Sequence, residues 1–190
     1  IGNNCAIGNA YPVFEKGRKY MAPGMYGACG YGFPAIVGAK IGQPKVPVVG
    51  FAGDGAFGIS MNEMTAIGRD QWPAITMIVF RNYQWGAEKR NTTLWFDDNF
   101  VGTELDPDVS YAGIARACGL EGVQATTMDD LREKLGAAIK AQMKDGRTTF
   151  IEVMTNQELG EPFRRDAMKK PVAVAGIEAA DMRPQKGVSS

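Results

Sequence analysis

The fold is decided by the stretch VPVVGFAGDGAFGISMNEMTAIGRDQWPAITMIVFRN, residues 46–82. Val46–Ala52 is a β-branched and almost wholly apolar run, which is typical of a strand covered on both faces in a parallel sheet. Ile59–Arg69 then carries apolar residues at helical spacing, and Ala74–Phe80 is a second buried-strand run. The stretch therefore predicts a β-α-β unit.

Helices and strands alternate along the rest of the chain. Helices are expected at Gly32–Ile41, Tyr111–Cys118 and Met128–Lys144, and strands at Gly122–Ala125 and Thr149–Met154. This order predicts a doubly wound α/β fold, with a largely parallel sheet and helices on both faces. Ligands of such sheets bind at the carboxyl ends of the strands.

Two segments do not follow this alternation. Thr92–Pro107 is polar, aromatic and acidic without a period, which predicts a functional loop or a lid. Glu158–Ser190 is charged and contains proline, which indicates an arm that wraps another surface or ends in disorder. We therefore predict a domain over residues 1–157 and a C-terminal arm over residues 158–190.

The composition favours a protein that acts on a small molecule. The chain has 190 residues with 45% hydrophobic and 22% charged content, which suits one globular domain. Lys plus Arg and Asp plus Glu are both 21, so a strong general attraction to nucleic acid has no support. The longest apolar stretch, around Ala74–Phe80, is too short to span a membrane, and the N-terminus lacks a signal-peptide pattern. We therefore expect a cytoplasmic protein with no membrane or nucleic-acid partner.

The chain contains no histidine, which removes the commonest general base and the catalytic triads built on it. Cys5, Cys29 and Cys118 lie far apart without the spacing of a zinc or redox site, so reduced thiols are expected. Any chemistry must then use carboxylates, amides, cations or a cofactor.

Polar side chains follow two successive strands of the predicted sheet. Asp54, flanked by Gly53 and Gly55, comes where the first strand ends, and Asn82 follows the next strand. Both should reach the same edge of the sheet, where a backbone carbonyl near Gln84 can join them. Oxygen ligands of this kind suit Mg²⁺, which also binds substrate phosphates. The sequence therefore predicts a magnesium site at Asp54, Asn82 and Gln84.

The glycines beside Asp54 allow a diphosphate to approach the backbone. The amides of Gly55, Ala56 and Phe57 open the helix that follows, and amides at a helix start can donate to an anion. The cation and these amides would neutralise one anion together.

Residues 53–82 resemble the signature of thiamine diphosphate (ThDP)-dependent enzymes, which opens with Gly-Asp-Gly and closes with an Asn-Asn pair. The resemblance implies that ThDP and Mg²⁺ are the cofactors and that Asp54, Asn82 and the carbonyl of Gln84 bind the metal. Arg81 replaces the first Asn of the pair and places a cation beside the site. The residues that the resemblance assigns to the cofactor are Gly27, Cys29, Gly53, Asp54, Gly55, Ala56, Phe57, Asn82, Gln84, Trp85 and Gly86.

The segment GACGYGFPAIVGA, residues 27–39, resembles the part of these enzymes that holds the aminopyrimidine ring. The resemblance implies that Gly27 offers a carbonyl to the ring. Cys29 stands where a larger apolar residue usually props the cofactor into its bent form, and its side chain is small for that task.

Residues 81–107 and 156–172 are similar to the sulfoacetaldehyde acetyltransferase branch of this family. The similarity implies a reaction in which sulfoacetaldehyde and phosphate give acetyl phosphate and sulfite. It also implies a homodimer or homotetramer, and an activating glutamate in an N-terminal pyrimidine-binding domain that is absent from these 190 residues. We assign no catalytic residue here and expect the isolated chain to be inactive.

Arg81, Lys89 and Arg90 follow the metal motif and are candidates for binding the sulfonate or phosphate, since guanidinium groups bind oxyanions well. An ordinary solvated or interface cluster is an equal alternative. Two alternatives to the acetyltransferase also stay open. One is the small subunit of a two-chain ThDP-dependent 2-oxo acid decarboxylase, and the other is a non-catalytic diphosphate-binding module.

Overall fold

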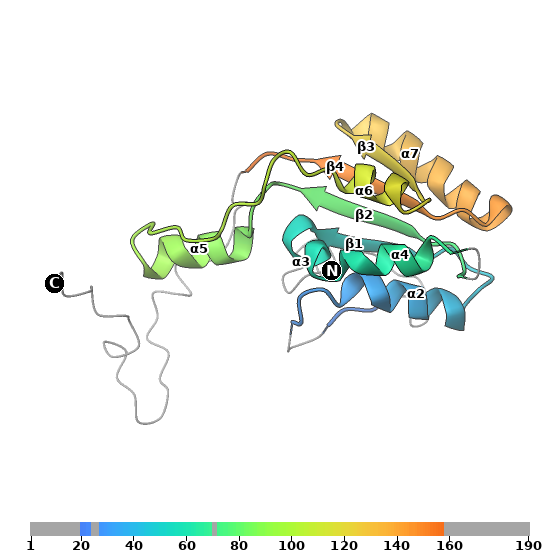
Figure 1. Cartoon of the computed structure of the whole chain (residues 1–190), viewed down its shortest axis with the longest axis horizontal. Helices are drawn as coiled ribbons and strands as arrows, with labels where there is room; N and C mark the ends of the chain where they lie inside the picture. The colour runs from blue at the N-terminus through green and yellow to red at the C-terminus, as the bar shows by residue number, and fades with distance from the viewer. Residues whose placement is uncertain (1–19, 24–26, 70–71, 158–190) are drawn as a thin grey trace, which may run out of the picture. The chain divides into compact units, whose positions relative to one another are not determined.

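The computed structural model describes residues 20–23, 27–69 and 72–157, which belong to two units (Figure 1). The first unit comprises Ile1–Tyr83 and Leu105–Asn156, and the second comprises Gln84–Glu104 and Gln157–Ser190. The predicted arm, residues 158–190, lies outside the described residues, so the predicted division at residue 157 stays a prediction.

The first unit is built on a four-stranded parallel sheet with the strand order β1-β2-β4-β3. The strands are β1 (Val49–Gly53), β2 (Thr76–Arg81), β3 (Glu121–Ala125) and β4 (Thr149–Met154). The predicted parallel α/β sheet is therefore confirmed, and β4 has the predicted bounds. β1 begins later than predicted because Pro47 has no amide hydrogen to contribute to a sheet.

Helices precede and connect the strands of this unit (Figure 1). Their bounds are α2 (Gly32–Gly42), α3 (Asp54–Ser60), the 3₁₀ turn η2 (Met61–Glu63), α4 (Met64–Ile67), α6 (Tyr111–Ala117), α7 (Met128–Lys140) and the π-helical turn η3 (Ala141–Asp145). The helix predicted over Ile59–Arg69 begins earlier and is divided. Gly53 is extended and Asp54 is already helical, so the Gly-Asp-Gly sequence is itself the start of α3.

Two hydrophobic clusters cover the two faces of the sheet. On β2, Met77 and Val79 belong to one cluster, whereas Ile78 and Phe80 belong to the other, as the alternation of side chains along a strand requires. The first cluster packs residues of α2, α3, α4 and α6 against the sheet, and the second packs residues of α7. Helices on both faces are thus confirmed for this unit.

Close packing of β3 against α6 depends on Gly122. A Cβ atom on Gly122 would lie 2.1 Å from the backbone oxygen of Ala112, which cannot move away as a side chain could. We expect Gly122→Ala to destabilise the fold by about 3 kcal/mol. Gly136 lies in the exposed middle of α7 with nothing within 4 Å of such an atom, so Gly136→Ala should stabilise the protein by about 1 kcal/mol.

Thermal unfolding of both variants checks this prediction. The two melting temperatures should move in opposite directions from that of the parent protein. Equal melting temperatures for Gly122→Ala and the parent would contradict the close approach of β3 and α6.

The second unit contains α5 (Gly86–Trp95), which overlaps a segment predicted to be a loop. The prediction of Thr92–Pro107 as wholly irregular is therefore wrong at its start, because the helix that opens at Gly86 continues through Trp95. An antiparallel bridge joins Gln84 to Glu104. Among the described residues, no helix of either unit is long and apolar enough to cross a membrane.

Candidate cofactor site

Asp54 lies at the carboxyl end of β1, and its side chain is only 1% exposed. Its Oδ2 accepts hydrogen bonds from Arg81 Nη1 at 3.1 Å, from the Asn82 amide at 3.1 Å and from the Tyr83 amide at 2.7 Å. Its Oδ1 accepts the amide of Gly55 at 2.9 Å. The end of β1 and the turn after β2 therefore meet at this carboxylate, at the edge of the sheet that the sequence predicts.

The turn after β2 adopts an unusual backbone conformation. Tyr83 has a φ of 61°, in the left-handed region that bulky residues seldom occupy. This conformation aims the Tyr83 amide at Asp54, while the Tyr83 carbonyl accepts the amide of Leu105 at 2.8 Å. The turn holds the backbone of Asn82, the second predicted metal ligand, beside the Asp54 carboxylate.

Arg81 is buried between two acids. Its exposed fraction is 0%, and its Nε lies 3.7 Å from Glu152 Oε1 while its Nη1 contacts Asp54. Its Nη2 donates to the carbonyl oxygens of Asp106 and Val109. The sequence pattern made Arg81 a candidate ligand for a substrate anion. This placement argues against that role, because the guanidinium is fully buried and faces two acids, where a substrate anion would not reach it.

Glu152 is a member of this site that the sequence analysis did not identify. Its carboxylate, on β4, accepts hydrogen bonds from Ser110 Oγ, from the amides of Tyr111 and Ala112 and from Gln124 Nε2. It thereby satisfies amides at the start of α6. A signal was present in the sequence, since Glu152 is the one acid in the apolar run TFIEVM.

The electrostatics of Asp54 reflect its burial. Desolvation raises the pKa of the Asp54 carboxyl, and the hydrogen bonds from Tyr83, Arg81 and Gly55 act in the opposite direction. The charged form of Asp54 therefore depends on these donors.

The residues predicted to hold the diphosphate lie in the first turn of α3. Gly55, Ala56 and Phe57 are buried there, and the first amides of a helix have no acceptor within it. The Gly55 amide contacts Asp54, as described above. Phe57 packs against Phe33 in the core, which fixes the helix on the sheet.

The turn predicted to hold the aminopyrimidine packs against the same helix. Gly27 and Gly30 both have positive φ, and Cys29 between them is half-buried. A Cβ atom on Gly30 would lie 2.9 Å from Ile59 Cγ2 and 3.8 Å from the Ala56 carbonyl oxygen. The turn at residues 27–30 thus lies directly against α3.

The donors present fit a hard cation better than a soft one. No group of three or more His, Cys, Asp or Glu side chains suitable for a metal occurs within the part of the chain that the structure describes. The predicted ligands are instead one buried carboxylate, an amide and a backbone carbonyl. This set suits Mg²⁺, which uses few protein oxygens together with phosphate and water.

The remaining predicted site residues belong to the second unit. Gln84 is 2% exposed, Trp85 precedes α5 and Gly86 begins it. Lys89 forms an ion pair with Glu104, and hydrogen bonding to Lys89 lowers the pKa of that acid. The Arg90 backbone lies in α5, and its side chain is outside the described atoms.

Comparison with known families matches this arrangement. The family described as "Thiamine pyrophosphate enzyme, C-terminal TPP binding domain" matches residues 1–153. The chain belongs to this family. TPP is another name for ThDP, so the family agrees with the cofactor that the sequence predicts.

Several sulfoacetaldehyde acetyltransferases are similar to this TPP-binding domain. The protein of that name from Roseovarius nubinhibens is 76% identical over 186 residues, which cover 98% of this chain and 31% of that protein. Those from Rhodobacter capsulatus and Castellaniella defragrans are 74% identical over 97% of the chain and 49% identical over 90% of it. The chain spans about a third of the length of the relatives it matches.

Solved structures of thiamine enzymes share the fold. Benzoylformate decarboxylase from Polynucleobacter necessarius is similar with a TM-score of 0.59 at 26% identity, over 72% of this chain and 25% of that one. The 4-hydroxybenzoylformate decarboxylase of Rhodococcus jostii aligns with a TM-score of 0.58 at 24% identity, over 71% of this chain and 24% of that one.

Proposed function

We propose that this chain is the cofactor domain of a ThDP- and Mg²⁺-dependent acetyltransferase. The reaction proposed converts sulfoacetaldehyde and phosphate to acetyl phosphate and sulfite. The observation that carries the proposal is the buried Asp54 carboxylate, held beside the backbone of Asn82 where β1 and β2 end. The 76% identity to a sulfoacetaldehyde acetyltransferase supports this choice of substrate.

The chain's own residues would bind and orient the cofactor. Asp54 and Asn82 would hold Mg²⁺, joined by the carbonyl of Gln84, and the amides at the start of α3 would receive the diphosphate. ThDP, once bound, supplies the nucleophilic carbon for the covalent chemistry. Gly27 and Cys29 would meet the aminopyrimidine ring.

Lys89 and Arg90 remain the proposed contacts for the sulfonate or phosphate. Lys89 already pairs with Glu104, so a substrate anion would compete with that acid. We also propose a cytoplasmic homodimer or homotetramer, because the resemblance to the family implies an active site that lies between subunits.

Assays of the full-length protein test this proposal. We expect release of sulfite and formation of acetyl phosphate from sulfoacetaldehyde, both requiring ThDP, Mg²⁺ and phosphate. The isolated 190-residue chain should bind the cofactor more weakly and release no sulfite.

Two outcomes would overturn the assignment. Carbon dioxide from a 2-oxo acid, with no sulfite from sulfoacetaldehyde, would favour the decarboxylase. Cofactor binding without turnover of either substrate in the full-length protein would favour a non-catalytic diphosphate-binding module.

A further inference from the structure

Arg81 is the largest fully buried side chain among the described residues. Its planar guanidinium is fixed by hydrogen bonds from Nη1 to Asp54 and from Nη2 to two backbone carbonyl groups, while Nε lies 3.7 Å from Glu152 Oε1 as an ion pair without a hydrogen bond. The ring of Tyr83 lies 4.3 Å from its central carbon atom. A cation held in this way has one orientation.

The contacts of Arg81 restrict Asp54. The guanidinium and the amides of Asn82 and Tyr83 all donate to Asp54 Oδ2. Three donors on one oxygen fix the rotation of the carboxylate, so the direction in which Oδ1 points is also fixed. If a metal ligand is not oriented before the ion binds, part of the binding free energy is spent on ordering it, and the affinity for the ion falls.

The charges of the cluster are also defined. Asp54 and Glu152 flank a single guanidinium, so with both acids ionised the three side chains together carry one negative charge. Removing Arg81 alone would leave two negative charges close together. If electrostatic attraction alone mattered, Arg81→Met would then bind a divalent cation more tightly. If the orientation of the Asp54 carboxylate matters more, the variant binds the cation more weakly. The two effects have opposite signs and can be separated.

We propose that Arg81 is a positioning residue, which holds the Asp54 carboxylate in the orientation that binds Mg²⁺ and is itself held by Glu152. This inference rests on the proposed function, because it assumes that Asp54 binds the ion. The role proposed for Arg81 requires no contact with substrate or cofactor, since its guanidinium is fully buried against the two acids. Its departure from the Asn-Asn pair of the family is therefore a change in how the metal ligand is supported.

The test compares Arg81→Met with the double variant Arg81→Met/Glu152→Gln in the full-length protein. The double variant removes one positive and one negative charge, so the cluster keeps the parent's net charge. The measured quantity is the Mg²⁺ concentration that gives half-maximal ThDP binding, determined by calorimetry. The melting temperature without Mg²⁺ and ThDP is recorded for each variant.

We expect both variants to need at least tenfold more Mg²⁺. Tighter binding by Arg81→Met, or a value within twofold of the parent for the double variant, would overturn the proposal. Arg81→Lys should also fall short of the parent, because an ammonium group cannot span the same contacts in one plane. If Arg81→Met does not fold, the double variant decides the outcome, because it removes the second buried acid together with the cation and leaves only Asp54, which keeps its amide donors.

Thr127→Ala is the matched control for lost stability. Its hydroxyl caps α7 by accepting the Asp130 amide at 3.1 Å, away from the cluster, so this variant should melt earlier with its Mg²⁺ requirement unchanged. A raised Mg²⁺ requirement in Thr127→Ala would show that destabilisation alone has this effect and would remove the support for positioning.

Asp54→Ala separates the role of Arg81 from the proposed function. If Asp54→Ala still binds ThDP in a Mg²⁺-dependent way, the proposed function fails. If Asp54→Ala does not bind ThDP while Arg81→Met has the Mg²⁺ requirement of the parent, only the role of Arg81 is refuted.

Discussion

Asp54→Ala is expected to abolish Mg²⁺-dependent binding of ThDP. The variant loses the only carboxylate among the predicted metal ligands and leaves the amides of Asn82 and Tyr83 without their acceptor. Loss of a residue that merely supports a metal ligand costs about 10–100-fold in affinity, so loss of the charged ligand itself should weaken binding by about a hundredfold or more. Calorimetric titration of the full-length protein with ThDP, with and without Mg²⁺, measures the loss.

The matched control for this substitution is Asp129→Ala. Asp129 lies on α7 with its side chain 92% exposed, in an ion pair with Arg132 on the same helix. Removing it should leave ThDP binding unchanged. Binding by Asp54→Ala that equals binding by Asp129→Ala would contradict the assignment of the metal site.

Glu152→Ala is expected to produce the largest loss of stability. The substitution leaves Ser110, Gln124 and two amides of α6 without their acceptor, and leaves Arg81 with one acid instead of two. Breaking such a buried network costs about 3–5 kcal/mol. The first transition in a thermal scan should move down by roughly 10 °C.

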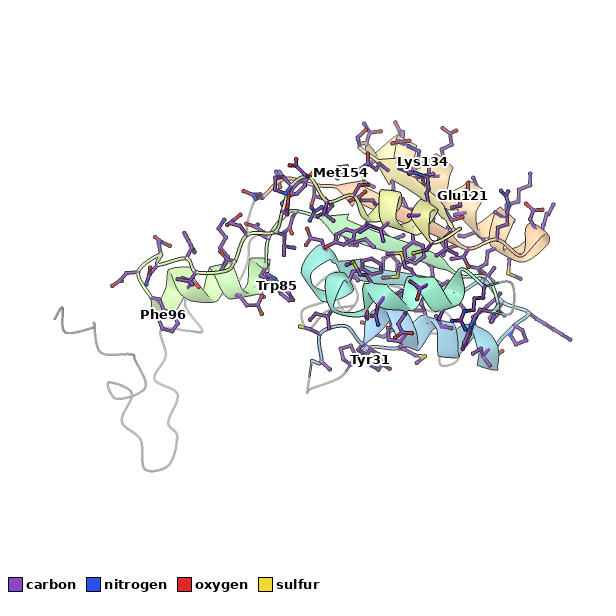
Figure 2. All side chains as sticks on the ribbon, viewed as in Figure 1. Tyr31, Trp85, Phe96, Glu121, Lys134 and Met154 are labelled. Atoms are coloured by element: carbon purple, nitrogen blue, oxygen red, sulfur yellow. The ribbon has the colours of Figure 1, made fainter. Side chains whose placement is uncertain are left out.

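Glu121→Ala provides the comparison, because Glu121 is an acid on the neighbouring strand β3 that faces solvent (labelled in Figure 2). Its contact with Arg147 is 3.5 Å long, and both side chains are substantially exposed. Its removal should change stability by no more than about 0.5 kcal/mol. Similar melting temperatures for the two variants would show that Glu152 is not the centre of a buried network.

The sheet and its ligand edge follow from simple patterns in the sequence. The apolar runs around β1 and β2 predict buried parallel strands, and parallel strands place Asp54 and Asn82 at one edge. Both expectations needed only the period of the side chains and the order of the elements. The apolar period marks the helix after β1 only from Ile59, whereas the amides expected to open it belong to Gly55–Phe57, and the structure begins the helix one residue earlier, at Asp54.

The role of Arg81 could not be read from local composition. A basic residue beside a metal motif suggests an anion site, and only its depth in the fold shows that it faces two acids. Alternation along the strands offered a partial signal. Val79 of β2 is paired with Glu152 of β4 in the sheet. Arg81 lies two residues after Val79, so its side chain is on the same face of the sheet as Glu152. Figure 2 labels Met154, the last residue of β4.

The length of the helix after the metal motif was also missed. α5 contains Asn91 and two threonines, which have modest helix propensity, so its sequence gives little helical signal. Contacts with residues 103 and 104 stabilise this helix where its own propensity is weak. The Lys89 side chain pairs with Glu104, and the Trp85 amide donates to the Thr103 carbonyl at 2.7 Å.

Anomalous diffraction from crystals of the full-length protein, grown with ThDP and with Mn²⁺ in place of Mg²⁺, locates the ion directly. We predict a single strong peak between the diphosphate and this chain, about 2.1–2.3 Å from an oxygen of Asp54 and from the side-chain oxygen of Asn82. A peak that touches neither side chain, beside a well-ordered diphosphate, would contradict the account.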